Sequence, residues 1–107
     1  MTEPTAKIAD PGNAGAIPVD KSGWCPIVTA GTETRTLAAP TFEGQELWLF
    51  IKTDGGTCVI TAAAAINAAG NTIMTMADVT DTMFLKAVAS GSTLVWRVVS
   101  SDGSALS

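Results

Sequence analysis

A series of short apolar runs separated by glycine-containing turns occupies the chain from Glu46 to Ser101. Each run is too short for a helix of ordinary length, and most are rich in the β-branched and aromatic residues that strands favour. Short strands joined by tight turns are typical of a sandwich or a barrel. The pattern therefore predicts an all-β domain, a small antiparallel β-sandwich or barrel of about seven short strands. Its main strands are expected at residues 46–52, 58–60, 71–76, 83–88 and 94–99.

The strongest local prediction is a hairpin at residues 54–56, where the sequence is Asp-Gly-Gly. Glycine adopts the positive φ angles that two-residue hairpin turns need. The turn is therefore expected to pair residues 46–52 with residues 58–60. The alanine-rich stretch 61–70 is expected to be a loop with one helical turn at most, because so short a helix is marginal in water.

The N-terminal residues 1–23 differ from the rest, since they carry several prolines, glycines and alanines and few large apolar groups. Such a segment buries too little surface to fold by itself. Two interpretations stay open, a frayed terminus or an extended arm that lies on a neighbouring subunit. The chain is accordingly divided into an extended N-terminal arm, residues 1–23, and a β-domain, residues 24–107. In the arm interpretation, Ile8, Ile17 and Val19 contact the neighbour.

Charged residues make up 15% of the chain and hydrophobic residues 47%, whereas about 25% charge is usual. A small domain with so little charge exposes apolar surface or has it covered by a partner. The net charge is −4 and the six cations are scattered. Without a basic patch, neither nucleic acid nor an anionic membrane is an expected partner.

The chain has no histidine, which removes the usual general base near neutral pH and the commonest metal ligand. It has no nucleophile-elbow motif and no glycine-rich phosphate loop. No catalytic, cofactor or metal site is therefore predicted, and the chain is not expected to be an enzyme. Cys25 and Cys58 are interpreted as buried free thiols, with a single bridge as the open alternative. The N-terminus does not resemble a signal peptide, so folding in a cytoplasm is expected.

Several predicted strands are apolar on both faces. In residues 46–52 one face carries leucine and isoleucine, and the other carries Trp48 and Phe50. A solvated face would alternate to polar residues. The second face is therefore a strand side buried within the domain, a subunit interface or a sugar-stacking platform of tryptophans. The predicted interface residues are Trp48, Phe50, Phe84, Val95 and Arg97.

Residues 44–61, 65–75 and 94–99, with the Thr-Leu-Ala-Ala-Pro step at 36–40, resemble small structural proteins of tailed-phage virions. The resemblance covers about residues 34–104. It implies a capsid decoration (cementing) protein or a head fibre, typically a homotrimer, without a cofactor. It further implies the major capsid protein as partner, so that Ile8, Ile17 and Val19 of the arm contact the capsid or an adjacent subunit. The implied location is the capsid surface of a virion assembled in the host cytoplasm. The alternative is a tail or head fibre module that binds a host receptor or glycan.

Overall fold

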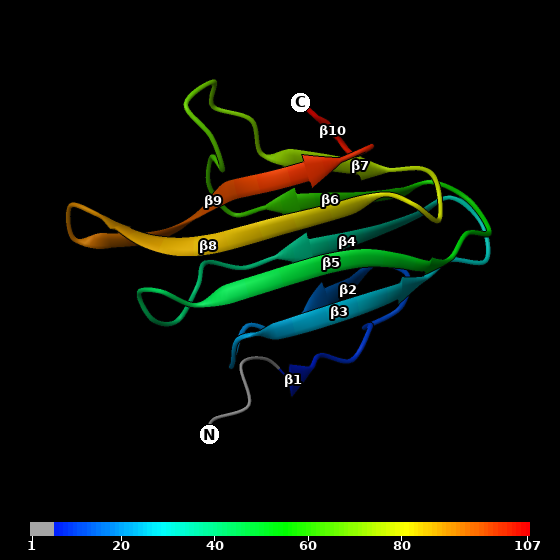
Figure 1. Ribbon diagram of the computed structural model, residues 1–107, viewed down its shortest axis with the longest axis horizontal. Coiled ribbons are helices and arrows are strands. Elements are labelled where there is room, and N and C mark those ends of the chain that lie inside the picture. The colour runs from blue at the N-terminus through cyan, green and yellow to red at the C-terminus, as the bar shows by residue number, and fades with distance from the viewer. Residues whose placement is uncertain (1–5) are drawn as a thin grey trace.

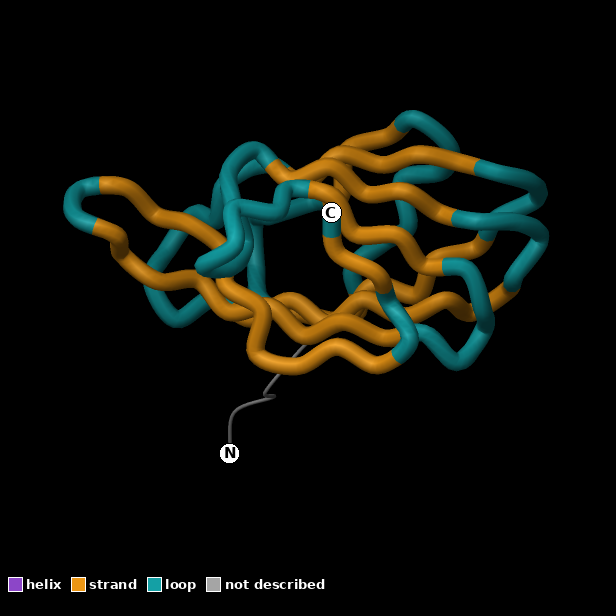
Figure 2. The backbone as a smooth tube through the Cα atoms, turned by 90° about the horizontal axis from the view of Figure 1, so that it is seen from above, coloured by secondary structure: helices purple, strands orange, loops and turns teal. Residues whose placement is uncertain are grey.

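The computed structural model describes residues 6–107, which form ten strands and no helix (Figure 1). The strands are β1 (Ala6–Lys7), β2 (Gly15–Ile17), β3 (Gly23–Val28), β4 (Glu33–Leu37), β5 (Glu46–Thr53), β6 (Cys58–Ala62), β7 (Ile73–Met76), β8 (Thr82–Ser90), β9 (Thr93–Asp102) and β10 (Ala105–Leu106). They make two five-stranded sheets, called here sheet A (order β1-β3-β5-β8-β9) and sheet B (order β10-β7-β6-β4-β2). The sheets form two layers, seen from above in Figure 2. The predicted small all-β sandwich is confirmed.

The first six strands alternate between the two sheets. In sheet A, β1, β3 and β5 lie side by side in parallel, and in sheet B β2, β4 and β6 do the same. This half of the domain is therefore built like a short solenoid of stacked turns of chain, which we call coils. Each coil contributes one strand to sheet A and one strand to sheet B. The later strands pair antiparallel, as β5–β8, β8–β9, β6–β7 and β7–β10. The sheets are thus mixed, whereas the sequence predicted antiparallel pairing throughout.

The predicted hairpin at residues 54–56 is wrong, because β5 belongs to sheet A and β6 to sheet B. The connection is an arch between the sheets, and neither of its glycines has a positive φ. A Cβ atom at Gly55 would lie 2.2 Å from the Thr29 carbonyl oxygen, and one at Gly56 would lie 2.3 Å from the Gly31 carbonyl carbon. The glycines are therefore needed so that this arch can stack closely on the preceding one.

The core fills the space between the sheets, and it includes residues that were predicted to lie in an arm outside the β-domain. Ile8 and Ile17 are buried within this chain, and Val19 is partly buried against the hydrophobic core. The prediction of an extended arm is therefore corrected for the described part of it: residues 6–22 form the first coil of the domain. The physical reason is that β1 and β2 pair through their backbones with β3 and β4, which requires little side-chain bulk. Residues 1–5, the rest of the predicted arm, lie outside the described residues.

A buried arginine fastens this first coil to the next. The Arg35 side chain is fully buried on β4, and its Nε and Nη2 donate to the two Asp10 carboxylate oxygens at 2.8 and 3.0 Å. Its Nη1 donates to Glu33 at 2.9 Å and its Nη2 also donates to the Val28 carbonyl at 3.1 Å. The Asp10 carboxylate in turn accepts the backbone N–H of Val28 and of Gly12. Because both ions of this pair are hydrogen-bonded, the buried charge is tolerated.

A second polar anchor and the two cysteines complete the interior. The buried Gln45 amide donates to the carbonyls of Val19 and Lys21 at 2.8 and 3.2 Å, and its oxygen accepts the Thr41 backbone N–H at 2.8 Å. Both cysteines are free and buried. Burial raises the pKa of Cys25 to about 12, so this thiol stays protonated at neutral pH.

We predict that Asp10→Asn lowers the free energy of unfolding by roughly 2–4 kcal/mol, because the buried Arg35 guanidinium loses the carboxylate that balances its charge. Burial raises the pKa of Asp10, but hydrogen bonds from Arg35, Val28 and Gly12 outweigh it and lower the pKa below its usual value. The carboxylate therefore stabilises the fold above about pH 4, and this contribution is lost as pH falls through the lowered pKa.

The measurement is urea denaturation between about pH 7 and about pH 2, with Asp20→Asn at an exposed aspartate as the control. The wild type and Asp20→Asn should lose stability on acidification in parallel, and Asp10→Asn should lose less. Equal stability of Asp10→Asn and wild type at neutral pH would contradict the structural role of the pair.

Gly56→Ala should destabilise the domain by about 1–3 kcal/mol or more, because the new methyl group meets the backbone of the preceding arch. Gly31→Ala is the matched control, since a Cβ atom there has no neighbour within 4 Å and the φ angle is ordinary. Thermal unfolding followed by circular dichroism compares them. If both variants melt at the same temperature, the arches do not stack as described.

Candidate functional site

The outer side of sheet A carries a row of aromatic side chains. Side chains alternate along a strand, so every second residue of β3, β5 and β8 points away from the core. Trp24, Trp48 and Phe84 occupy matching positions on these neighbouring strands, and Lys7 of β1 lies opposite Trp24. Phe50 lies opposite Pro26 in the next outward-facing row. An apolar surface thus runs across the sheet.

The centre of this surface is a stacked cluster, which we call the aromatic cluster, of Trp48, Phe50 and Phe84. The Trp48 and Phe84 rings lie 3.8 Å apart between centroids at an interplanar angle of 11°. Trp48 and Phe50 lie 6.5 Å apart at 9°. All three side chains are only half-buried. The rings hold one another in a fixed, flat arrangement whose outer side is accessible.

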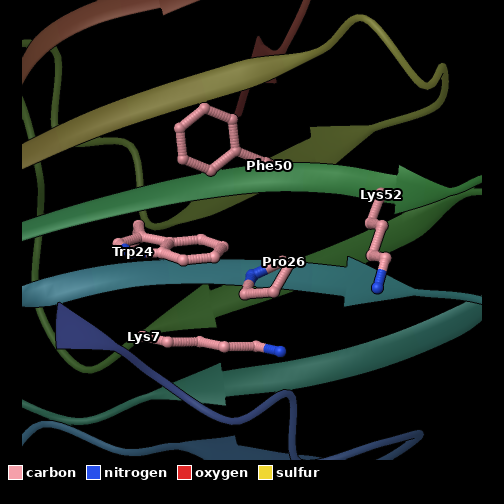
Figure 3. A pocket seen from close by; sticks show the side chains of 5 residues that line it. All are labelled: Lys7, Trp24, Pro26, Phe50 and Lys52. Atoms are coloured by element: carbon pink, nitrogen blue, oxygen red, sulfur yellow. The ribbon is translucent and has the colours of Figure 1, made fainter.

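Beside the aromatic cluster lies an open depression of about 470 Å³, lined by Lys7, Trp24, Pro26, Phe50 and Lys52 (Figure 3). Trp24 and Pro26 come from β3, and the strands on either side, β1 and β5, supply the other three residues. Trp24 is 38% exposed as a residue. The Lys7 ammonium lies 6.0 Å from the centre of its ring, within the range of a cation–π contact.

The lining determines which ligands the depression suits. Its apolar surface comes from Trp24, Pro26 and Phe50. Among the described residues that line it, both charged groups are ammonium groups. A flat apolar group buries its surface against the rings, and a carboxylate attached to it meets Lys7 or Lys52. The geometry therefore suits an aromatic or aliphatic group that carries negative charge.

The structure brings together only some of the predicted interface residues. Trp48, Phe50 and Phe84 form the aromatic cluster, whereas Val95 is buried and Arg97 is half-buried on β9. The Arg97 Nη1 donates to the Ala65 carbonyl at 2.8 Å, so its charge serves a contact within the chain. One residue further on, the Val98 N–H donates to the Ile66 carbonyl. The loop between β6 and β7 thus covers the edge of β9.

The predicted arm residues also belong to the domain interior rather than to this surface. Ile8 and Ile17 face the core, and the Val19 carbonyl accepts hydrogen bonds from Gln45 and Thr41. Sequence reasoning missed Lys7, Pro26 and Lys52 as site residues, and it considered Trp24 only as part of a sugar-stacking platform with Trp48 and Trp96. The alternation of Trp24, Pro26 and Val28 repeats that of Trp48 and Phe50, and this was the signal that could have identified Trp24 and Pro26.

Other candidate groups have ordinary structural roles. Trp96 is buried and its Nε1 donates to the Ala38 carbonyl at 2.9 Å, so the three tryptophans do not share a face. The Asp81 carboxylate accepts the backbone N–H groups of Ala77 and Asp78, which makes it a turn cap. Within residues 6–107 there is no cluster of three potential metal ligands among acidic and cysteine side chains. The same residues include no helix long and apolar enough to cross a membrane.

A scan against models of known protein families gave no match, and a search of curated protein sequences gave no significant match.

We predict that the depression, where no other subunit covers it, binds aromatic anions, for which anilinonaphthalene sulfonate is a convenient fluorescent probe. Trp24→Ala and Lys52→Glu should each weaken binding by about tenfold, because one removes apolar contact and the other reverses a charge. Lys21→Glu, at an exposed lysine that does not line the depression, is the control for net charge. Identical titration curves for all four proteins would place the probe elsewhere.

Proposed function

We propose that this protein is a structural component of a tailed-phage virion, which decorates and stabilises the capsid as a homotrimer. The supporting observation is the aromatic outer side of sheet A. The sequence resemblance to small virion proteins supports the same assignment, and it covers most of the residues that form this surface.

The two outer faces of the sandwich differ in a way that supports assembly. On sheet B the outward positions of β4 and β6 carry three exposed threonines, Thr34, Thr36 and Thr61, and one half-buried valine, Val59. A polar face of this kind is usual where a sheet meets water. The matching positions of sheet A carry tryptophan, phenylalanine and proline. A subunit interface would cover these rings, since aromatic residues are enriched in the buried centres of such interfaces.

The architecture supports a cementing role as well. Stacked arches and a buried ion network make a rigid body, which loses little conformational freedom when it binds. On a capsid, many copies engage many equivalent sites, so contacts that are weak singly become strong together. With residues 6–22 folded into the domain, the shell contact is assigned to the domain surface rather than to an arm formed by these residues.

The alternative, a fibre module that binds a host receptor or glycan, is favoured by one observation. Trp24 is exposed at the depression, where it could stack against a sugar ring. Two lysines in the lining would select an acidic sugar.

The test has two steps, oligomer mass and capsid binding. Light scattering at micromolar concentration should give three times the 10.9 kDa of the chain. Phe84→Glu should shift the mass towards the monomer, because a buried carboxylate at the interface is unpaired. Thr36→Glu on the outer side of sheet B is the matched control and should leave the trimer intact.

In the second step, the protein is mixed with capsids assembled from the major capsid protein encoded in the same genome. It should sediment with them at saturable stoichiometry. A strict monomer in the first step would overturn the homotrimer. Absence of co-sedimentation in the second would overturn the decoration role and favour the fibre module.

A further inference from the structure

A cyclic trimer requires two different surfaces on each subunit, because the contact is head-to-tail rather than between identical patches. This inference rests on the proposed homotrimer. The depression on sheet A is a suitable receiving surface, since it is concave, apolar and flanked by two lysines. The inserted element must then be a projecting apolar side chain from another part of the chain, with negative charge beside it.

Five large apolar side chains are exposed in the described part of the chain, namely Trp24, Val28, Phe42, Val79 and Val99. Trp24 and Val28 belong to β3 and Val99 to β9, all in sheet A. Phe42 and Val79 remain, and both lie on loops. Phe42 is the larger of the two, and the residue is 45% exposed.

The loop that carries Phe42, residues 38–45, is held firmly. The buried Gln45 accepts the Thr41 N–H and bonds the Val19 carbonyl, and the Gly44 N–H donates to the Ala87 carbonyl at 2.9 Å. The Gln45 N–H also donates to the Phe42 carbonyl at 3.3 Å. An exposed phenylalanine on a fixed loop loses little conformational entropy on insertion into a partner.

The charges of the two surfaces are complementary. Glu43 follows Phe42 and is exposed, with one carboxylate oxygen accepting the Ala89 N–H at 3.3 Å. Glu43 and Lys52 do not pair along β5 within one subunit. Glu43 precedes the start of that strand, whereas Lys52 lies near its end. The six steps from residue 46 to residue 52 span on the order of 20 Å. An acidic, aromatic tip and a basic, aromatic depression are thus held apart on one subunit.

We propose that Phe42 of one subunit inserts into the depression of the next, where its ring packs on Trp24 and Phe50. Glu43 pairs there with the ammonium group of Lys52. The contact is heterologous, and in the proposed homotrimer it closes into a ring of three without leaving a free end. The occupant of the depression is therefore a second copy of this chain.

Sedimentation velocity of the full chain over a concentration series tests the proposal. Phe42→Ala should raise the trimer dissociation constant by at least about tenfold, as removal of a central aromatic anchor does. Glu43→Lys and Lys52→Glu should each weaken the trimer, and the double variant with both changes should recover much of the loss. Val79→Ala is the matched control, an exposed apolar residue next to an aspartate on another loop, and should leave the constant unchanged.

Circular dichroism melts identify variants that fail to fold, which is not expected at exposed side chains. A trimer that is indifferent to Phe42→Ala and to the charge reversals would overturn this contact and leave the proposed homotrimer standing. A wild-type monomer would overturn both, and a dimer would indicate that the face packs on its own copy. Binding of an acidic glycan that Lys52→Glu abolishes, with an unchanged trimer, would assign the depression to the glycan instead.

Discussion

The contact between Arg35 and Asp10 holds the architecture together where its apolar contacts are fewest. The first coil of the domain contributes β1 and β2, only two and three residues long, and little apolar bulk besides two isoleucines. Arg35 reaches from β4 to the turn after β1 and to the carbonyl of Val28 at the end of β3. One side chain therefore links three segments that belong to both sheets. Without it, the first coil would depend on short backbone pairing, the two buried isoleucines and the Gln45 contacts.

Strand positions could be predicted from sequence because alternation is a local property. The inward leucines of β5 and the aromatic cluster were both derived from that alternation, since neighbouring strands bring equivalent residues together. Strand partners could not be derived in the same way. The Asp-Gly-Gly sequence at 54–56 suits a hairpin and an arch equally, and only the backbone of residues 29–31 distinguishes them. Similarly, nothing local shows that residues 6–22 pair with strands that come later in the chain.

The site was only partly predictable for the same reason. Trp48, Phe50 and Phe84 lie in long apolar strands whose second face is evident from sequence. Lys7 and Trp24 reach that face only because β1 pairs with β3 and β3 with β5 in parallel register. Arg97 belongs to β9 as expected, but its guanidinium donates a hydrogen bond to the Ala65 carbonyl in the loop between β6 and β7. Contacts between residues far apart in the chain determine which side chains share this surface, and the spacing of residues in the sequence does not predict those contacts.

The two margins of sheet A constrain how copies of this protein join. An unpaired strand margin is a template on which another chain adds by backbone hydrogen bonding. At the margin formed by β9, the Val98 N–H already donates to the Ile66 carbonyl. At the other, β1 is short, Pro26 has no N–H to offer, and the Val28 N–H is bonded to Asp10. These features disfavour the extension of sheet A from molecule to molecule by backbone pairing, and with it polymerisation into cross-β fibrils.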